Sequence, residues 1–380
     1  MKRLIYILAA IVIVAVIVLC IGVNEIGDKE PVAEAVATNG SEEKENFIES
    51  HVAENTSTQG NTTKETTTKE TTTKEDVTQE DTTPEDTSSE EPTSREESTT
   101  KPNENNNDGT DYIYYQVRDD ENNAVAFGDI EASEEQLKSI DELIKSYGKP
   151  VSFKAVSVDG SGGVSFNSQQ TYFAASSIKA PYLLYCYKQM DNGDGTLTET
   201  MTYNSSYYKD GSGDMKNSAN GTVYELSEIM RRVMWNSDNV GYNMCVSRWG
   251  RTGYNTFLES IGLSNLKLSS GSIWVYDVRA EDLVIAWKNI YDYFNSGAQH
   301  AEIFYDNCIN VKWNVLGEGL PGLTIAQKYG IGYDVFCDTA IVYGKNQTYL
   351  LAIFTDSEAN SKDKAFMNDL AKLINNIIDK

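Results

Sequence analysis

The pattern of apolar and polar positions divides the chain into three parts. Leu4–Val23 is an unbroken apolar run, residues 24–110 are polar almost throughout, and residues 111–380 interleave apolar and polar side chains. Only the last part has enough apolar side chains for a sizeable core, and its 270 residues suit one large domain. The pattern therefore predicts three regions, with boundaries at 1–23, 24–110 and 111–380.

Within residues 111–380 the apolar positions follow helical periodicity in some segments and alternate in others. Helices are expected over 134–147, 175–190, 224–235, 240–249, 253–261, 281–294 and 361–378, and strands over 151–158, 164–167, 323–328, 333–342 and 348–355. Thr222 and Ser361 are candidate N-caps for two of these helices. Strands at both ends with helices between them predict an α/β (α+β) domain. One antiparallel sheet would be flanked by helices, and an all-helical lobe would be inserted in the middle.

Leu4–Val23 is long enough to cross a bilayer as a helix, since about 20 apolar residues suffice. Lys2 and Arg3 precede it and an acidic stretch follows, which places the N-terminus in the cytoplasm by the positive-inside rule. A cleaved signal peptide is the alternative, but its apolar core would be shorter and Ala33–Ala35 is a poor cleavage site. We therefore expect an uncleaved single-pass anchor in the cell membrane, with the large domain outside.

Residues 24–110 carry most of the charge. They hold 23 acidic and 7 basic residues and so contribute −16 to the formal net charge of −25. The unit K-E-T-T-T repeats within residues 62–75, and apolar side chains are scarce. Such a segment cannot offset the entropy of ordering, so we expect a disordered, solvated spacer. Neither this segment nor the rest has a basic stripe, which argues against a nucleic-acid partner.

Histidine and cysteine usage narrows the chemistry. The two histidines are His51, in the polar segment, and His300, in a stretch expected to be helix surface without a triad partner. A Ser-His-Asp or Cys-His enzyme would have to use His300, so these mechanisms are disfavoured. The cysteines of residues 111–380 are widely spaced, with no C-x-x-C: Cys186, Cys245, Cys308 and Cys337. We expect buried reduced thiols, no metal and no cofactor.

With histidine scarce, lysine is the candidate base for a nucleophilic serine. Ser176 and Lys179 are three residues apart on a predicted helix and so share a face, with Cβ atoms about 6 Å apart. A lysine buried near a helix start can have a lowered pKa, and the Ser176 N–H would point toward a developing oxyanion. A capping serine with a surface lysine is the commoner explanation of S-x-x-K. The rest of this helix is apolar, however, and burying a lysine there would otherwise be costly.

Two later motifs are weak when taken singly. Ser237-Asp238-Asn239 lies 61 residues after Ser176, between two predicted helices, and alone indicates a helix-capping turn. Lys328-Tyr329-Gly330 ends an apolar segment. Taken by itself, this tripeptide indicates only an ordinary lysine at the end of a strand. A lysine there can also bind an anionic group of a substrate, and glycine permits close backbone approach.

Taken together, the order S-x-x-K, S-D-N and K-x-G resembles the class A β-lactamases and the wider serine penicillin-recognising enzymes, over residues 130–380. The flanking segments 207–214, 221–237, 319–328, 334–342 and 349–355 are also similar to that family. The resemblance implies a β-lactamase/transpeptidase-like fold. It also implies an acyl-enzyme formed with β-lactams or related acyl-D-amino-acid peptides, such as peptidoglycan stem peptides, and we expect a monomer.

The resemblance implies a role for each motif residue. Ser176 would be the nucleophile, Lys179 its general base and Ser237 a proton relay to the leaving nitrogen. The substrate would be bound by the Asn239 amide, by the Lys328 ammonium with Tyr329 and Gly330 beside it, and by an oxyanion hole from the N–H groups of Ser176 and Ile331.

The sequence departs from the family pattern at two places. Tyr329 stands where the family has Thr or Ser, whose hydroxyl helps to bind the substrate carboxylate, so a tyrosine would reach differently or narrow the site. Class A enzymes also carry E-x-x-L-N after the S-D-N helix, and its Glu activates the deacylating water. Residues 263–278 contain no Glu, and Asp277 is their only acid. Acylation is therefore expected and rapid deacylation is not. A slow β-lactamase, a penicillin-binding D,D-peptidase, an esterase and a non-catalytic wall-binding or sensor module stay open.

Overall fold

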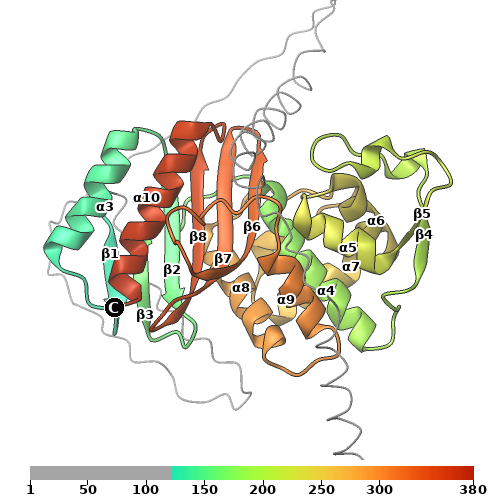
Figure 1. Cartoon of the computed structure of the whole chain (residues 1–380), viewed down its shortest axis with the longest axis horizontal. Coiled ribbons are helices and arrows are strands. Elements are labelled where there is room, and N and C mark those ends of the chain that lie inside the picture. Colours follow the sequence, from blue (N-terminus) through green and yellow to red (C-terminus); the bar gives the residue numbers. More distant parts are fainter. Residues whose placement is uncertain (1–121) are drawn as a thin grey trace, which may run out of the picture. The chain divides into compact units, whose positions relative to one another are not determined.

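A computed structural model describes residues 122–380 (Figure 1). The predicted anchor, Leu4–Val23, and the acidic spacer at 24–110 lie outside the described residues. Within residues 122–380, none of the helices combines the length and the apolar character that a bilayer span requires.

A six-stranded antiparallel sheet in the order β1-β3-β2-β8-β7-β6 forms the centre of the domain (Figure 1). Its strands are β1 (Val125–Gly128), β2 (Val151–Ser157), β3 (Gly162–Phe166), β6 (Thr324–Gly332), β7 (Val335–Tyr343) and β8 (Thr348–Asp356). Pairing of β2 with β8 joins the N-terminal and C-terminal strands. The prediction of one antiparallel sheet built from both ends of the domain is confirmed. The sequence pattern missed β1, because four residues are too few to show alternation.

Two helices cover one face of the sheet and a third covers the other. The first face carries α3 (Glu134–Tyr147) and α10 (Ser361–Ile378), and the opposite face carries α8 (Ala280–Phe294) (Figure 1). In α10 the N-cap is Asn360 rather than the predicted Ser361, since the Asn360 side chain accepts from the backbone N–H of Lys362 and Asp363. An N-cap amide satisfies helix N–H groups as well as a serine hydroxyl does.

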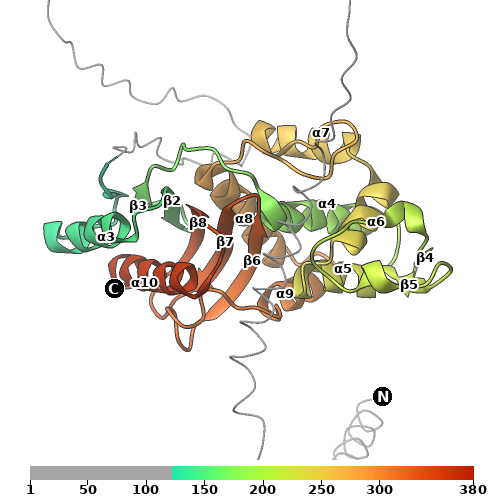
Figure 2. The ribbon, with the colours of Figure 1, turned by 90° about the horizontal axis from the view of Figure 1, so that it is seen from above.

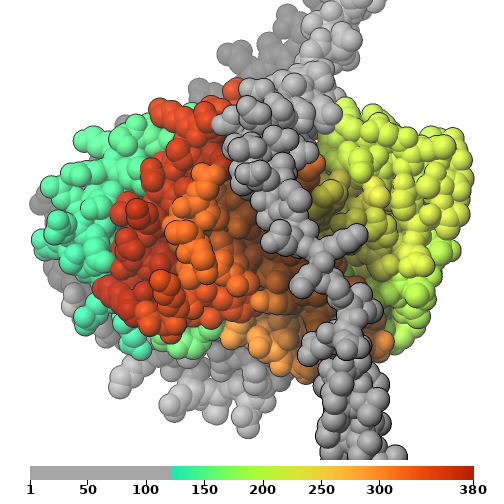
Figure 3. Space-filling view, viewed as in Figure 1, coloured from blue at the N-terminus to red at the C-terminus, as the bar shows by residue number. Residues whose placement is uncertain are grey.

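The middle of the sequence forms the predicted helical lobe beside the sheet (Figure 2). Its helices are η1 (Ala175–Ile178), α4 (Lys179–Asp191), η2 (Ser205–Tyr207), η3 (Met215–Asn217), α5 (Leu226–Trp235), α6 (Asn239–Trp249), α7 (Thr252–Ser260), η4 (Ser264–Leu266) and α9 (Ala301–Ile309). It also contains the strand pair of β4 (Thr200–Thr202) and β5 (Val223–Glu225). The space-filling surface extends from α3 and α10 to this strand pair at the far end (Figure 3).

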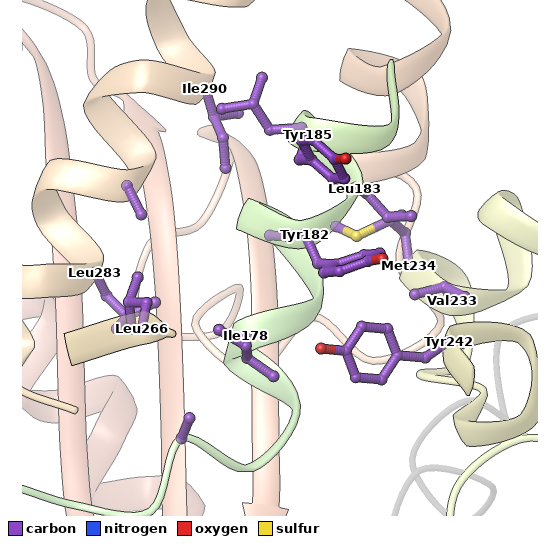
Figure 4. Packing of buried hydrophobic residues seen from close by; sticks show 14 of the residues in the cluster. Ile178, Tyr182, Leu183, Tyr185, Val233, Met234, Tyr242, Leu266, Leu283 and Ile290 are labelled. Atoms are coloured by element: carbon purple, nitrogen blue, oxygen red, sulfur yellow. The ribbon is translucent and has the colours of Figure 1, made fainter. Parts of the chain in front are cut away.

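The hydrophobic core of the lobe is organised around α4. Tyr182 and Leu183 of α4 face Met234 of α5 and Tyr242 of α6 (Figure 4). All four side chains are fully buried. Close packing against α5 and α6 fixes the rotation of α4, and therefore the direction of the residues that begin it.

One predicted helix begins later than the sequence pattern indicates. The periodicity over 224–235 includes residues that form β5, which pairs with Thr200–Thr202, and the helix begins at Leu226. Thr222 does not cap this helix, because its hydroxyl donates to the carbonyl oxygen of Ala219. A local pairing between two short strands thus overrides the helical pattern.

Candidate active site

A cavity of about 170 Å³ lies where the helical lobe meets β6, the last strand of the sheet. Its walls come from five stretches of chain: Phe173, Ala175 and Ser176; Lys209, Asp210, Gly211 and Ser212; Asn239; Trp274; and Ile331, Gly332 and Tyr333. Three residues predicted from the motifs, Ser176, Asn239 and Ile331, therefore line one cavity.

Ser176 lies in the short 3-10 turn that leads into α4. Ala175, directly before it, has φ of 46°, a left-handed conformation that residues with a side chain rarely adopt. The turn is pressed against β6 at Gly330, where a Cβ would lie 2.8 Å from the Ser176 backbone nitrogen. Gly330 thus contributes by having no side chain, which lets the strand approach the candidate nucleophile.

Lys179 is fully buried at the first position of α4. Its Nζ donates to the carbonyl oxygen of Ser237 at 2.5 Å and to Asn239 Oδ1 at 2.6 Å, and it lies 3.1 Å from Ser237 Oγ. These hydrogen bonds connect the lysine of S-x-x-K to the S-D-N motif. Within residues 122–380, the Lys179 amine makes no hydrogen bond to Ser176 Oγ, although Ser176 lies one helical turn away. An unliganded enzyme often lacks its nucleophile–base hydrogen bond, which forms when substrate binds.

Ser237 lies between two buried lysines. Its Oγ is 3.0 Å from Lys328 Nζ and 3.1 Å from Lys179 Nζ. Ser237 has φ of 60°, so its backbone is also left-handed. The predicted capping role within S-D-N belongs to Asp238, whose Oδ1 accepts from the Gly241 N–H at the start of α6. The motif therefore combines a helix cap with a strained serine that bridges two amines.

Burial lowers the pKa of both lysines. The pKa of Lys179 is held well below its ordinary value of 10.5 by desolvation and by the like charge of Lys328, with Asp238 acting in the opposite direction. Desolvation lowers the pKa of Lys328 to about 7, although the nearby Asp338 carboxyl raises it. A lowered pKa favours the neutral form of Lys179, which can accept a proton, whereas a Lys328 with a pKa of about 7 can still carry a charge near neutral pH.

Asn239 has both polar side-chain atoms engaged. Its Oδ1 accepts from Lys179, and its Nδ2 donates to the backbone carbonyl oxygen of Asp210 at 2.6 Å. The side chain thus connects the amine to the cavity loop at 209–212. To hold a substrate amide, as the resemblance implies, Asn239 would have to exchange one of these bonds.

The structure packs Tyr329 away from the cavity. Successive side chains of a strand point to opposite faces, so Tyr329 lies on the other face of β6 from Lys328. Its ring is buried against Trp313, with ring centroids 5.0 Å apart, and it does not line the cavity. Lys328 Nζ lies 4.2 Å from the Tyr329 ring centroid and donates to its carbonyl oxygen. Tyr329 therefore supports Lys328 and does not narrow the site.

The geometry and motifs agree with a comparison against known families. The model of the β-lactamase enzyme family matches residues 135–378, which is nearly the whole described domain. The chain belongs to this family. Among curated proteins, none matches the sequence.

Solved structures share the fold at low sequence identity. PBP-A is 21% identical with a TM-score of 0.56, and the match covers 63% of this chain and 94% of that chain. A β-lactamase from Sphaerobacter thermophilus is 18% identical with a TM-score of 0.57, covering 63% and 96%. A variant of PBP-A was solved as an acyl-enzyme complex with penicillin G, at 21% identity and a TM-score of 0.56, with coverage of 63% and 94%. The predicted β-lactamase/transpeptidase-like fold is confirmed.

Sequence reasoning missed several residues that line the cavity of this β-lactamase-family domain. Trp274, in the loop that lacks a Glu, lies close to Lys179, whose Nζ is 5.6 Å from its ring centroid. Phe173 and Tyr333 line the cavity as well. A single aromatic residue in a loop is a weak signal of such a role, because the sequence does not show the path that the loop takes. Asp277 is exposed and lies outside the lining.

His300 is buried in the β-lactamase-family domain, so its predicted place on a helix surface is wrong. Its Nδ1 lies 2.6 Å from Asp191 Oδ1, and Asp191 also accepts from the hydroxyl of Tyr293. Asp191 ends α4, about 18 Å along the helix from Lys179 at 1.5 Å per residue. The pair is therefore remote from Ser176 and joins α4, α8 and the start of α9.

The His, Cys, Asp and Glu side chains of residues 122–380 do not form a metal centre. The structure places no group of three or more His, Cys, Asp or Glu side chains there that could hold a metal ion. Cys186, Cys245, Cys308 and Cys337 are buried and free, as the spacing predicts.

Proposed function

We propose that this protein is a serine enzyme that forms an acyl-enzyme at Ser176 with β-lactams or with related acyl-D-amino-acid peptides. The observation that supports this most strongly is the buried amine of Lys179, one helical turn from Ser176. Burial holds its pKa well below the ordinary value, which favours the neutral amine that can act as the base a serine requires to become a nucleophile. A buried lysine has no structural advantage over an apolar residue at this position.

In the proposed acylation, Ser176 Oγ attacks the substrate carbonyl carbon and its proton passes to Lys179 Nζ. The bond between that carbon and the amide nitrogen then breaks. The leaving nitrogen takes its proton through Ser237 Oγ, which is 3.1 Å from Lys179 Nζ and 3.0 Å from Lys328 Nζ. The backbone N–H groups of Ser176 and Ile331 would stabilise the oxyanion, and both residues line the cavity.

The edge position of β6 suits an extended substrate. β6 pairs with β7 on one side only and ends the sheet order. An extended peptide can add to such an edge through backbone hydrogen bonds. Lys328, in its protonated form, would attract a carboxylate held along this strand. These features fit a peptide that ends in a D-amino acid, as well as a β-lactam that mimics one.

We infer slow deacylation of the acyl-enzyme. Hydrolysis needs a base that activates water, and residues 263–278 bring Trp274 rather than a carboxylate near Lys179. The carboxylate in the described cavity lining is that of Asp210, which hydrogen-bonds the Gly211 N–H and Lys216 Nζ. This arrangement favours a penicillin-binding D,D-peptidase, or a slow β-lactamase, over an efficient β-lactamase.

A time course of mass spectrometry after exposure to benzylpenicillin tests the proposal. We expect a covalent adduct on the wild type that decays slowly, and no adduct on Ser176→Ala. Ser177→Ala is the matched control, because Ser177 is adjacent and buried and its hydroxyl donates to the Ala174 carbonyl oxygen. Absence of any adduct from a penicillin, a cephalosporin or a D-alanyl thioester on the folded wild type would refute the proposal. Such a result, with ligand binding retained, would favour the non-catalytic wall-binding or sensor module.

We further propose that Leu4–Val23 anchors a monomer in the cell membrane and that residues 24–110 hold its domain outside the cell. The support is the apolar run, the preceding Lys2 and Arg3, and the acidic composition that follows. Full-length protein should sediment with membranes and be digested by protease added to intact cells, and deletion of residues 1–23 should release it. Protection from external protease would contradict this orientation.

A further inference from the structure

The amine of Lys328 lies over the ring of Tyr329, the next residue in β6. Lys328 Nζ is 4.2 Å from the ring centroid, and both side chains are fully buried. A cation is attracted to the face of an aromatic ring within about 6 Å, and the attraction is strongest where water is excluded. Tyr329 stands where the family pattern has Thr or Ser, so the ring in this contact is one that the pattern does not contain.

A buried ammonium needs partners that replace its water, because an isolated buried charge is costly. Lys328 Nζ donates to Ser237 Oγ at 3.0 Å and to the carbonyl oxygen of Tyr329 at 2.9 Å. Both acceptors are neutral oxygens. Among the side chains of residues 122–380, no carboxylate forms an ion pair with Lys328. The ring face is therefore a further partner that can favour the charged amine.

The titratable groups around Lys328 give its ammonium little net support. Lys179, at the start of α4, has the same charge when it is protonated and opposes it. Asp338 and Cys337 of β7 and Cys308 of α9 favour it. Burial raises the pKa of Asp338 and of both thiols, which favours the neutral forms of all three groups. A ring face, in contrast, attracts a cation without carrying a charge of its own.

Packing fixes the Tyr329 ring before any ligand binds. Trp313 meets it edge to face, with ring centroids 5.0 Å apart and planes inclined by 68°. Phe336 of β7 stacks on Trp313, with centroids 5.5 Å apart. All three rings are fully buried. The ring face that meets the amine is therefore held in place by the core and does not have to be ordered when the amine takes up a proton.

We propose that Tyr329 is a positioning residue whose ring face favours the protonated Lys328 amine and holds it beside Ser237. This proposal rests on the proposed function, in which the protonated amine attracts the carboxylate of the substrate. The ring extends to higher pH the range in which Lys328 binds that carboxylate. Weakening the ring face removes a favourable contact from the charged form alone, so it lowers the pKa of Lys328.

The test changes the electrostatics of the ring and keeps its shape. Tyr329→Phe is made first, and fluorinated phenylalanines are then incorporated at position 329, because fluorine weakens the negative face of the ring. The titration of Lys328 in the full-length protein is followed by NMR of lysine labelled with ¹³C at Cε, with Lys328→Met to assign the signal. Tyr329→Phe should titrate close to wild type. The midpoint should fall as fluorines are added, by about one pH unit for the most fluorinated ring.

Phe336 provides the matched control. It belongs to the same aromatic stack and is equally buried, and its ring contacts Trp313. Fluorination at position 336 should leave the Lys328 midpoint unchanged. A midpoint that stays constant across the series at position 329, or that falls equally for both positions, would overturn the role of the Tyr329 ring. So would a rise of the midpoint, since it would mean that the ring acts only by excluding water.

Acylation gives a second readout that separates this proposal from the proposed function. The pH at which benzylpenicillin loses its advantage over its methyl ester should fall across the series by the same amount as the NMR midpoint. If neither compound forms an adduct at Ser176, the proposed function fails, and the NMR series still decides whether the ring favours the charged amine. If both acylate the protein and the midpoint does not respond to fluorination at position 329, the role of Tyr329 fails alone.

Discussion

The Nζ of Lys179 donates a 2.5 Å hydrogen bond to the backbone carbonyl oxygen of Ser237. The left-handed backbone of Ser237 (φ of 60°) accompanies this contact. The strain at Ser237 and the burial of Lys179 both cost stability, so a role in chemistry explains their presence better than a role in folding.

Lys179→Met tests whether the amine acts as a base. We expect adduct formation with benzylpenicillin to slow by about 10²–10⁴-fold, the usual contribution of a positioned base. Thermal unfolding is the control, since methionine has similar length and suits a buried position. Acylation at the wild-type rate in a folded Lys179→Met protein would contradict the assigned role.

The pH dependence should follow Lys328, whose pKa burial lowers to about 7. Below that pH the amine is protonated and attracts a substrate carboxylate, and above it the attraction is lost. Acylation by a carboxylate-bearing penicillin should therefore decline relative to its methyl ester as the pH rises through about 7. An equal response of the acid and the ester, followed by mass spectrometry, would show that Lys328 does not bind the carboxylate.

The same shift affects stability. The unfolded chain binds a proton at Lys328 up to its ordinary pKa of 10.5, whereas the folded chain loses it near 7. Between these values the unfolded state holds more protons, so this group makes the free energy of unfolding rise with pH. Lys328→Met should flatten the rise from pH 7 upward, as measured by urea unfolding. An unchanged slope in the variant would argue against the lowered pKa.

Gly330→Ala tests the close approach of β6 to the turn that carries Ser176. The added Cβ would lie 2.8 Å from the Ser176 nitrogen and 2.9 Å from Cys337 Sγ, so the turn must move. We expect a stability loss of about 1–3 kcal/mol and acylation slowed at least tenfold, from urea unfolding and adduct kinetics. Ile331→Val, which keeps the backbone, serves as the control. Wild-type behaviour of Gly330→Ala would mean that this contact does not position Ser176.

Trp274→Glu tests the cause that we propose for slow deacylation. The substitution puts a carboxylate on the loop close to Lys179, where it can activate water. The adduct with benzylpenicillin should then decay at least tenfold faster, whereas Trp274→Phe should leave its lifetime near that of wild type. Equal adduct lifetimes in wild type and Trp274→Glu would place the cause elsewhere.

The sequence predicts those site residues that helices and strands position. The motif order predicts that Lys179, Ser237 and Lys328 come together, and the structure joins them through one hydroxyl. The alternation of a strand also places Tyr329 behind Lys328, although the departure from the family pattern at that position suggested a place in the cavity. The alternation shows only that Lys328 and Tyr329 lie on opposite faces of β6. Burial against Trp313 decides which of the two faces Tyr329 takes.

The rest of the site depends on loops, and no local pattern predicts their path. Trp274 and Tyr333 line the cavity because tertiary packing directs the 263–278 loop and the β6–β7 turn toward Phe173. The sequence pattern places His300 on a helix surface, because its partner Asp191 is over a hundred residues away and leaves no local signal. Contacts of this range follow from the assembled fold.

The most direct test of the account is the protonation state of Lys179 in the free protein. Lysine labelled with ¹³C at Cε gives an NMR signal that follows the charge of each amine, and Lys179→Met assigns the relevant resonance. We expect this amine to titrate well below 10.5. A Lys179 resonance that titrates at or above 10.5 would contradict its role as the base for Ser176.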